Sequence, residues 1–129
     1  MDDNLLIMGN YNSIFNKLLG INITHDVIYR SKGLPAHMLK SHHEKCLKYI
    51  DYIPEIIESP DYIGVNPNEQ GQSIELIKRY KDNVLLGIKV DKNDEYLYVS
   101  TMHDISETKL QRRLFGGRLK EFSVDTTEN

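Results

Sequence analysis

Three histidines near the middle of the chain are the side chains best suited to proton transfer. The chain has five histidines, and His37, His42 and His43 lie within seven residues of one another. Histidine gains and loses a proton near neutral pH more readily than other side chains do. A helical metal site would space its histidines as His-x-x-x-His, whereas His37 and His42 are five apart and His42 and His43 are adjacent. The spacing therefore indicates acid–base chemistry, and no metal site is predicted.

The single cysteine restricts the chemistry further. Cys46 has no second thiol with which to form a disulfide or a thiolate metal cluster. It lies within an apolar stripe, where a free cysteine usually behaves as a small buried apolar residue. A cysteine–histidine nucleophile is therefore not expected, and the sequence calls for no cofactor.

Size and composition are those of one globular domain. The chain has 129 residues, of which 40% are hydrophobic and 27% charged, enough to bury a core without disulfides. The domain is expected to span residues 1–122, with a frayed tail at 123–129. No apolar run approaches the roughly 20 residues that span a bilayer, and the acidic start differs from a signal peptide. We expect a cytoplasmic protein, or one delivered into the cytoplasm of a target cell.

The charge is unevenly distributed. A formal net charge of −3 gives no general attraction to nucleic acid. A stretch of twelve residues near the end nevertheless carries five cations and no carboxylate. This stretch is either a solvated helix face or a local phosphate-binding edge. Its cations are Lys109, Arg112, Arg113, Arg118 and Lys120.

One long amphipathic helix is predicted over residues 35–52, because Pro35 suits a first helical turn and the apolar residues recur at helical spacing. On a helical wheel His42 and His43 flank the apolar arc at about 50° to either side, so both are expected to face the protein body. His37 points away from the protein body if the helix is already regular there, and it turns inward if the first turn is irregular. A second short helix should follow at 55–58. The apolar arc consists of Leu39, Cys46, Leu47, Ile50 and Ile53.

The second half of the chain is expected to form a three-stranded antiparallel meander. Its strands are predicted at 73–80, 84–90 and 96–102, and links this short allow only antiparallel neighbours. A helix at 106–113 should follow, with Ser106 as its N-cap and a break at Gly116 and Gly117. Earlier in the chain we expect a strand and a helical turn within 4–20, a strand within 21–30 and an exposed loop at 64–71.

Cations and hydroxyl groups lie in phase with apolar residues on these strands. Lys89 shares a strand face with Leu85, and Thr101 shares one with Val99. Such positions are partly buried, which is costly without a purpose or a partner. Histidine on a helix, facing cations and hydroxyls on a sheet, is the set of groups that metal-free RNA cleavage uses. The strand candidates are Lys78, Arg79, Lys89, Tyr98, Ser100 and Thr101.

The order of these motifs resembles the phage-associated branch of the barnase–EndoU–colicin–RelE superfamily of small ribonucleases. The resemblance covers roughly residues 20 to 120, and the segments PDYIG and YLYVSTM are its most specific parts. The segments that carry it are 37–42 (HMLKSH), 49–57 (YIDYIPEII), 60–64 (PDYIG), 75–78 (ELIK), 83–90 (NVLLGIKV) and 96–102 (YLYVSTM).

The resemblance implies an α+β fold with an N-terminal helical part packed on an antiparallel sheet of about four strands. RNA would bind the open face of that sheet. The helix histidine of the family corresponds to His42, with His37 as the second member of the pair. The sheet cation corresponds to Lys78 or Lys89, the late-strand hydroxyl to Thr101 or Ser100, and the closing basic residue to Arg118.

The function expected from the resemblance is metal-independent endoribonuclease activity. The protein would act as a bacterial or phage-borne toxin or effector, with RNA as substrate and a cognate antitoxin or immunity protein as partner. In this interpretation Arg112 and Arg113 bind RNA phosphates. The alternatives are a catalytically inactive RNA- or protein-binding module on the same fold, and a purely structural or inhibitory domain.

Overall fold

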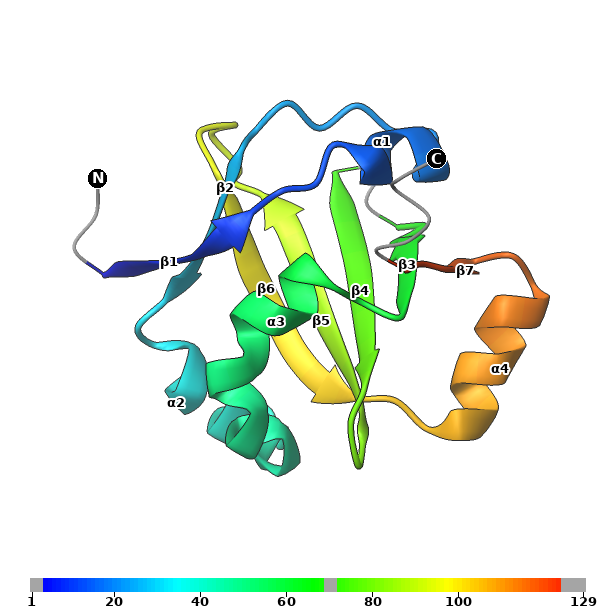
Figure 1. Cartoon of the computed structure of the whole chain (residues 1–129). Helices are drawn as coiled ribbons and strands as arrows, with labels where there is room; N and C mark the ends of the chain where they lie inside the picture. The colour runs from blue at the N-terminus through cyan, green and yellow to red at the C-terminus, as the bar shows by residue number, and fades with distance from the viewer. Residues whose placement is uncertain (1–3, 69–71, 124–129) are drawn as a thin grey trace.

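In the computed structural model, residues 4–68 and 72–123 are described, and they alternate between strands and helices before a strand-rich second half (Figure 1). The α+β class is confirmed. In chain order the elements are β1 (Leu5–Asn10), α1 (Ile14–Leu19), β2 (Val27–Ser31), α2 (Leu34–Lys40), the 3₁₀ helix η1 (Glu44–Tyr52), α3 (Ile53–Glu58), β3 (Tyr62–Val65), β4 (Ser73–Arg79), β5 (Asn83–Val90), β6 (Leu97–Asp104), α4 (Glu107–Phe115) and β7 (Leu119–Glu121).

One sheet joins all the strands, in the order β1-β2-β6-β5-β4-β3-β7. Neighbouring strands are antiparallel except β2 and β6, whose parallel pairing joins Ile28 to Leu97 and Tyr29 to Tyr98. The predicted meander is confirmed as β4, β5 and β6. The predicted last helix is confirmed as α4, where Ser106 Oγ accepts a hydrogen bond from the Lys109 backbone N–H at 3.2 Å.

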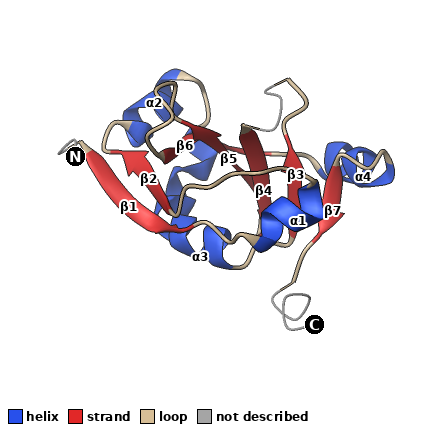
Figure 2. Cartoon of the chain, turned by 90° about the horizontal axis from the view of Figure 1, so that it is seen from above, coloured by secondary structure: helices blue, strands red, loops and turns tan. Residues whose placement is uncertain are grey.

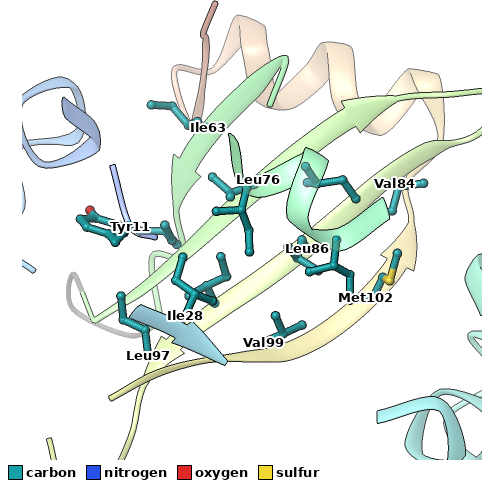
Figure 3. Packing of buried hydrophobic residues seen from close by; sticks show 14 of the residues in the cluster. Tyr11, Ile28, Ile63, Leu76, Val84, Leu86, Leu97, Val99 and Met102 are labelled. Atoms are coloured by element: carbon teal, nitrogen blue, oxygen red, sulfur yellow. The ribbon is translucent and has the colours of Figure 1, made fainter. Parts of the chain in front are cut away.

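The main core lies on one face of this sheet. Alternate residues of the central strands point into it, and Figure 3 shows Leu76, Leu86 and Val99 gathered from β4, β5 and β6. Alternation follows from the period of two in a strand. Helices α1, α2, α3 and η1 cover this face through buried side chains that include Phe15, Met38, Cys46, Tyr49, Ile53, Ile56 and Ile57.

The opposite face, which we call the second face, is covered in part by α4. Leu110 and Leu114 of that helix pack against Ile77 and Leu85 of the sheet and against Leu119 of β7. Figure 2 shows α4 beside β3 and β7, with β1 and β2 at the other end of the sheet. Neither apolar cluster of the described residues includes a side chain on the second face of β2 or β6.

The expected four-stranded sheet behind an N-terminal helical part is wrong. The sheet has seven strands and is mixed, and the N-terminal segment contributes β1 and β2 to it. The expected strand and helical turn within residues 4–20 are confirmed as β1 and α1. The two unexpected strands, β3 and β7, have four and three residues, too short to show a periodicity of their own. Of the expected tail, Ser123 is exposed and 124–129 lie outside the described residues.

The single helix predicted over 35–52 is also wrong, because the chain ends α2 at Lys40 and restarts at Glu44. His42 has a φ of 61°, its N–H donates to Leu39 O at 3.3 Å, and the N–H of His43 donates to Met38 O at 2.7 Å. This pair of bonds around a left-handed residue is a Schellman motif, which ends a helix. Glycine usually occupies the left-handed position. Because a histidine stands there in this chain, nothing in the sequence indicated that the helix ends.

The break changes which side chains face inward. Met38 is fully buried, whereas Leu39, expected in the apolar arc, is 55% exposed. His42 is exposed and does not face the protein body as the wheel predicted. Cys46 is buried, as expected. The helical wheel gave the wrong orientations because it assumed one continuous helix, whereas α2 ends at Lys40 and η1 begins at Glu44.

Gly64 was expected in an exposed loop but lies buried in β3. It pairs with Glu75 of β4 on one side and with Leu119 of β7 on the other. A Cβ at this position would lie 2.5 Å from the backbone oxygen of Arg118. Only glycine therefore allows the chain after α4 to cross so close to β3.

We predict that Gly64→Ala lowers the free energy of unfolding by about 1–3 kcal/mol, because the added methyl group must displace the backbone of Arg118. Chemical denaturation followed by circular dichroism measures this loss. Gly33→Ala is the matched control, since Gly33 has a negative φ and its nearest contact is a side-chain oxygen at 3.4 Å. The control should stay within about 0.5 kcal/mol of the wild type. Equal stability of both variants would contradict the close approach at Gly64.

Candidate active site on the second face of the sheet

A buried carboxylate lies at the centre of the second face. Glu75 of β4 is 6% exposed, and charged side chains are rarely buried unless they are paired. Its register neighbours are Gly64 on β3 and Gly87 on β5. Neither neighbour has a side chain, so space is left on both sides of the carboxylate for groups that come from elsewhere in the chain.

Two arginines fill part of that space and bind Glu75. Arg113, from α4, donates from Nη1 to Oε2 of Glu75 at 3.1 Å. Arg118, from the segment after α4, donates from Nε and Nη2 to Oε1 at 3.2 and 2.6 Å. Both arginines remain partly exposed. Two guanidinium groups around one carboxylate leave a net positive charge, which suits a phosphate group.

Two hydroxyl side chains lie on the other side of Gly87. The register between β5 and β6 shifts there, so that Gly87 pairs with Thr101 and Ile88 with Val99. Ser100 Oγ donates to the backbone oxygen of Gly87 at 3.2 Å. A Cβ on Gly87 would lie 2.7 Å from Thr101 Cγ2 and 3.2 Å from Ser100 Oγ. The bulge thus brings both predicted hydroxyls over Gly87, one strand away from Glu75.

Lys89 extends this polar group along β5. It is directly opposite Ser73 on β4 and Tyr98 on β6, and it is two residues from Gly87, so it lies on the same face. The second face therefore brings together five of the site residues expected from the sequence. These are Lys89, Ser100, Thr101, Arg113 and Arg118.

An ion pair fixes the start of α4 and so positions Arg113. Arg79 of β4 donates from Nη1 and Nη2 to the two carboxylate oxygens of Glu107 at 2.6 and 3.0 Å. Hydrogen bonds from Arg79, and then from Gln111 and Asn83, lower the pKa of Glu107 to about 2. The helix is thereby tied to β4 by Arg79 near its first turn and by Arg113 in its last turn.

Histidines lie along the β6 side of the site. His103 is directly opposite Leu85 and two residues from Thr101, which places it on the second face. The ring centroids of His43 and His103 are 5.2 Å apart, so the turn after α2 contacts β6. His42 is exposed in that turn, beside His43. We call His42, His43 and His103 the histidine rim.

Three of the expected site residues lie elsewhere. Lys78 points to the main-core face and donates to the backbone oxygen of Ser59 at 2.7 Å, which ties the end of α3 to β4. His37 is exposed on α2, and Arg112 is exposed on α4. They do not join the group around Glu75, and their expected roles stay predictions.

Sequence reasoning missed Glu75, Gly87 and His103. A signal for Glu75 was present, because it is the one charged residue between Ser73 and Ile77 and its neighbours Ile74 and Leu76 are apolar. A charge at a buried strand position needs a partner. The signals for Gly87 and His103 are weaker, because their importance comes from the register between strands and from the bulge in β6.

Within residues 4–68 and 72–123, no group of three or more His, Cys, Asp or Glu side chains is arranged to hold a metal ion. Over the same residues, no helix is long and apolar enough to cross a membrane.

Comparison with protein families gives one match. The family model described as phage-Barnase-EndoU-ColicinE5/D-RelE like nuclease 3 matches residues 6–112, which is most of the chain. No curated protein and no solved structure matches the chain significantly. The matched region includes Glu75, Gly87, Lys89, Ser100, Thr101 and His103. Arg113 and Arg118 follow it, so their connection to the site rests on their contacts with Glu75.

The low pKa of Glu107 predicts how the attachment of α4 depends on pH. A carboxyl whose pKa is lower in the folded state stabilises the fold above its unfolded value, near 4.5, and loses this effect as the pH falls through about 2. Thermal unfolding of the wild type and of Glu107→Gln should therefore differ at pH 7 and converge near pH 2. Glu58→Gln, at an exposed position on α3, is the control and should match the wild type throughout. A pH-independent gap between the wild type and Glu107→Gln would contradict this account.

Proposed function

The chain belongs to the phage-Barnase-EndoU-ColicinE5/D-RelE like nuclease 3 family, and from this premise we propose that it is an endoribonuclease that needs no metal ion. The observation that carries the proposal is the buried Glu75 carboxylate held between two partly exposed arginines on the second face. A carboxylate base beside cations supplies the proton acceptor and the charge stabilisation that RNA cleavage by attack of the 2′-hydroxyl needs.

In the proposed reaction, Glu75 accepts the proton of the ribose 2′-hydroxyl, and that oxygen forms a bond to the adjacent phosphorus. The bond from phosphorus to the 5′-oxygen of the next nucleotide breaks, and the leaving oxygen takes up a proton. The products are a 2′,3′-cyclic phosphate and a free 5′-hydroxyl. The family resemblance gave His42 and His37 as the catalytic pair of histidines, and we propose Glu75 as the base because it lies among the cations that would bind the phosphate.

The arginines stabilise the negative charge that gathers on the phosphorus centre. Arg118 is the more exposed of the two. Its guanidinium has further N–H donors beyond the two that bind Glu75, so one group can bind phosphate and carboxylate together. Lys89 provides a further cation on the same face, and the hydroxyl of Thr101 can donate a hydrogen bond to a phosphate oxygen. The hydroxyl of Ser100 donates to the backbone oxygen of Gly87 and so holds the bulge beside Thr101 in place.

The proton for the leaving oxygen comes from the histidine rim in this proposal. His103 is the member on β6 itself, and His42 is the member that the sequence resemblance favoured. His42 occupies a left-handed backbone position that costs a non-glycine residue about 1 kcal/mol. Strain of this kind is often found at functional positions, and this keeps His42 as the second candidate for the acid.

A second candidate function is an RNA-binding module without catalysis. Both oxygens of Glu75 already accept hydrogen bonds from arginine. A carboxylate that served only to tie α4 to the sheet would have the same arrangement. If Glu75→Gln no longer cleaves RNA but still binds it, Glu75 has a catalytic role. If the wild type binds RNA and cleaves none, the binding module is the better account.

We further propose that the nuclease acts as a toxin and that an acidic partner protein controls it. Phe115 at the end of α4 is 97% exposed, and Arg112 and Lys109 are exposed on the same helix. An exposed aromatic ring among cations suits a partner that offers an apolar pocket rimmed by carboxylates. Such a partner would lie close to Arg113 and Arg118 and could block access to Glu75.

We predict that Glu75→Gln lowers the single-turnover rate of RNA cleavage by about 10²- to 10⁴-fold, because glutamine has nearly the same shape but accepts no proton. The rate is measured on a labelled RNA in excess chelator, with the cyclic phosphate product identified by mass. Glu58→Gln, on the exposed side of α3, serves as the control and should cleave like the wild type. Undiminished cleavage by Glu75→Gln would remove Glu75 as the base, and cleavage that requires an added divalent ion would exclude the metal-independent mechanism.

The same assay separates the two histidines. His42→Gly relieves the left-handed backbone and should stabilise the fold by about 1 kcal/mol. If His103 is the acid, His42→Gly cleaves normally and His103→Gln is slow. The reverse result, with a more stable but slow His42→Gly, would assign the role to His42.

The toxin proposal predicts that wild-type protein stops bacterial growth when it is expressed without its partner. Glu75→Gln should be tolerated at the same expression level, because growth arrest depends on cleavage. Colony counts and cellular RNA integrity after induction measure the difference. Normal growth with intact RNA at high levels of wild-type protein would contradict a toxin role.

A further inference from the structure

Three tyrosines lie together on the second face, on the β2–β6 side that α4 does not cover. Tyr29 of β2 is in register with Tyr98 of β6, and Tyr96 is two residues before Tyr98. The ring centroids of Tyr29 and Tyr96 are 5.8 Å apart, and those of Tyr96 and Tyr98 are 6.1 Å apart. We call these three residues the tyrosine platform.

The platform is not part of either hydrophobic cluster of the described residues. Ile28 and Leu97, the chain neighbours of Tyr29 and Tyr98, are fully buried in the main core, so the two tyrosines point the opposite way. All three tyrosines are partly exposed. The rings meet edge to face, at interplanar angles of 84° for Tyr29 and Tyr96 and 64° for Tyr96 and Tyr98, so each ring presents part of its own face on this side of the sheet.

The platform continues directly into the candidate active site. Tyr98 is directly opposite Lys89, and it is two residues from Ser100, a distance of roughly 7 Å along a strand. A polymer bound with one phosphate near Arg118 and Ser100 would therefore reach the tyrosines with its next units. Lys89 lies between the two regions and can contact the connecting backbone.

The charges beside the platform favour bases over phosphates. A small pocket at its far end is lined by Tyr29 and Tyr96 together with Asp26, Glu95 and His25. Carboxylates repel phosphate, but they accept hydrogen bonds from the N–H groups on the edges of nucleobases. The backbone of a bound nucleic acid would then follow Lys89, while its bases turn toward the rings.

We propose that the tyrosine platform binds unpaired bases of RNA by stacking, so that the enzyme selects single-stranded RNA next to the phosphate it cleaves. This inference rests on the proposed function for the identity of the polymer. Base stacking on aromatic rings is strong and tolerates different sequences. In a duplex the base faces are already stacked on one another, so only an unpaired segment can use the platform.

The test is binding of an unstructured 2′-O-methyl RNA of about ten nucleotides, measured by fluorescence anisotropy. This probe has no free 2′-hydroxyl, so the reaction proposed above cannot cut it. Tyr98→Leu and Tyr29→Leu should each weaken binding about tenfold, because leucine keeps apolar volume but has no ring. Tyr98→Phe and Tyr29→Phe should bind like the wild type, and circular dichroism checks that each variant is folded.

Three controls separate base stacking on the platform from other contributions to binding. An abasic version of the probe keeps the phosphates but has no bases to stack. It should therefore bind the wild type weakly, and it should bind the leucine variants with the same weak affinity. Tyr52→Leu changes an exposed tyrosine on η1, which packs against the main-core face, and should not affect binding. A duplex of the same sequence should bind more weakly than the single strand.

The outcomes distinguish this inference from the nuclease proposal. Equal binding of the probe by the wild type and both leucine variants would overturn the platform, as would equal affinity of the wild type for the intact and abasic probes. If RNA is nevertheless cleaved with dependence on Glu75, the nuclease proposal stands. Ring-dependent binding without cleavage of any RNA would support the platform and overturn the catalytic proposal.

Discussion

The contact of Glu75 with Arg113 and Arg118 is the interaction on which the rest of this structure depends. A carboxylate buried in a sheet is stable only if cations accompany it. Here the cations come from α4 and from the segment after it, so this interaction helps to hold the last part of the chain on the sheet, together with the ion pair of Arg79 and Glu107. The two glycines beside Glu75 are a consequence, because side chains at Gly64 or Gly87 would occupy the space that the arginines, Ser100 and Thr101 require.

The same interaction connects stability with the proposed chemistry. Both oxygens of Glu75 accept hydrogen bonds from arginine, and in the proposed reaction a bound phosphate would attract part of that guanidinium hydrogen bonding. The partly exposed Arg118 is suited to that exchange, while Arg113 stays held by a helix whose first turn is fixed through Arg79 and Glu107. The site thus combines one fixed cation with one that can turn toward a ligand.

Periodicity allowed the regular elements to be predicted from the sequence. The meander β4–β6, α4 and the Ser106 cap follow from alternation, short links and a capping residue.

The break after α2 could not be predicted in this way, because a histidine takes the left-handed position that usually holds glycine. Strands β3 and β7 were missed because they are short and each is stabilised by partners far away in the sequence. Five residues expected for the site lie together on the second face, but Glu75 was not expected there, since its partners are arginines 38 and 43 residues later.

That separation in sequence also has a consequence for synthesis. Chains fold from their N-terminal end as the ribosome extends them. A nascent chain that has reached only the end of β6 already contains Glu75, Lys89, Ser100 and Thr101, but neither of the arginines that accompany the carboxylate. Until α4 and the turn at Gly116 and Gly117 emerge, Glu75 has no partner and β3 has no β7 beside it. The order of translation itself therefore delays assembly of this contact, and a chain cut short before Arg113 would lack both of the arginines that pair with Glu75.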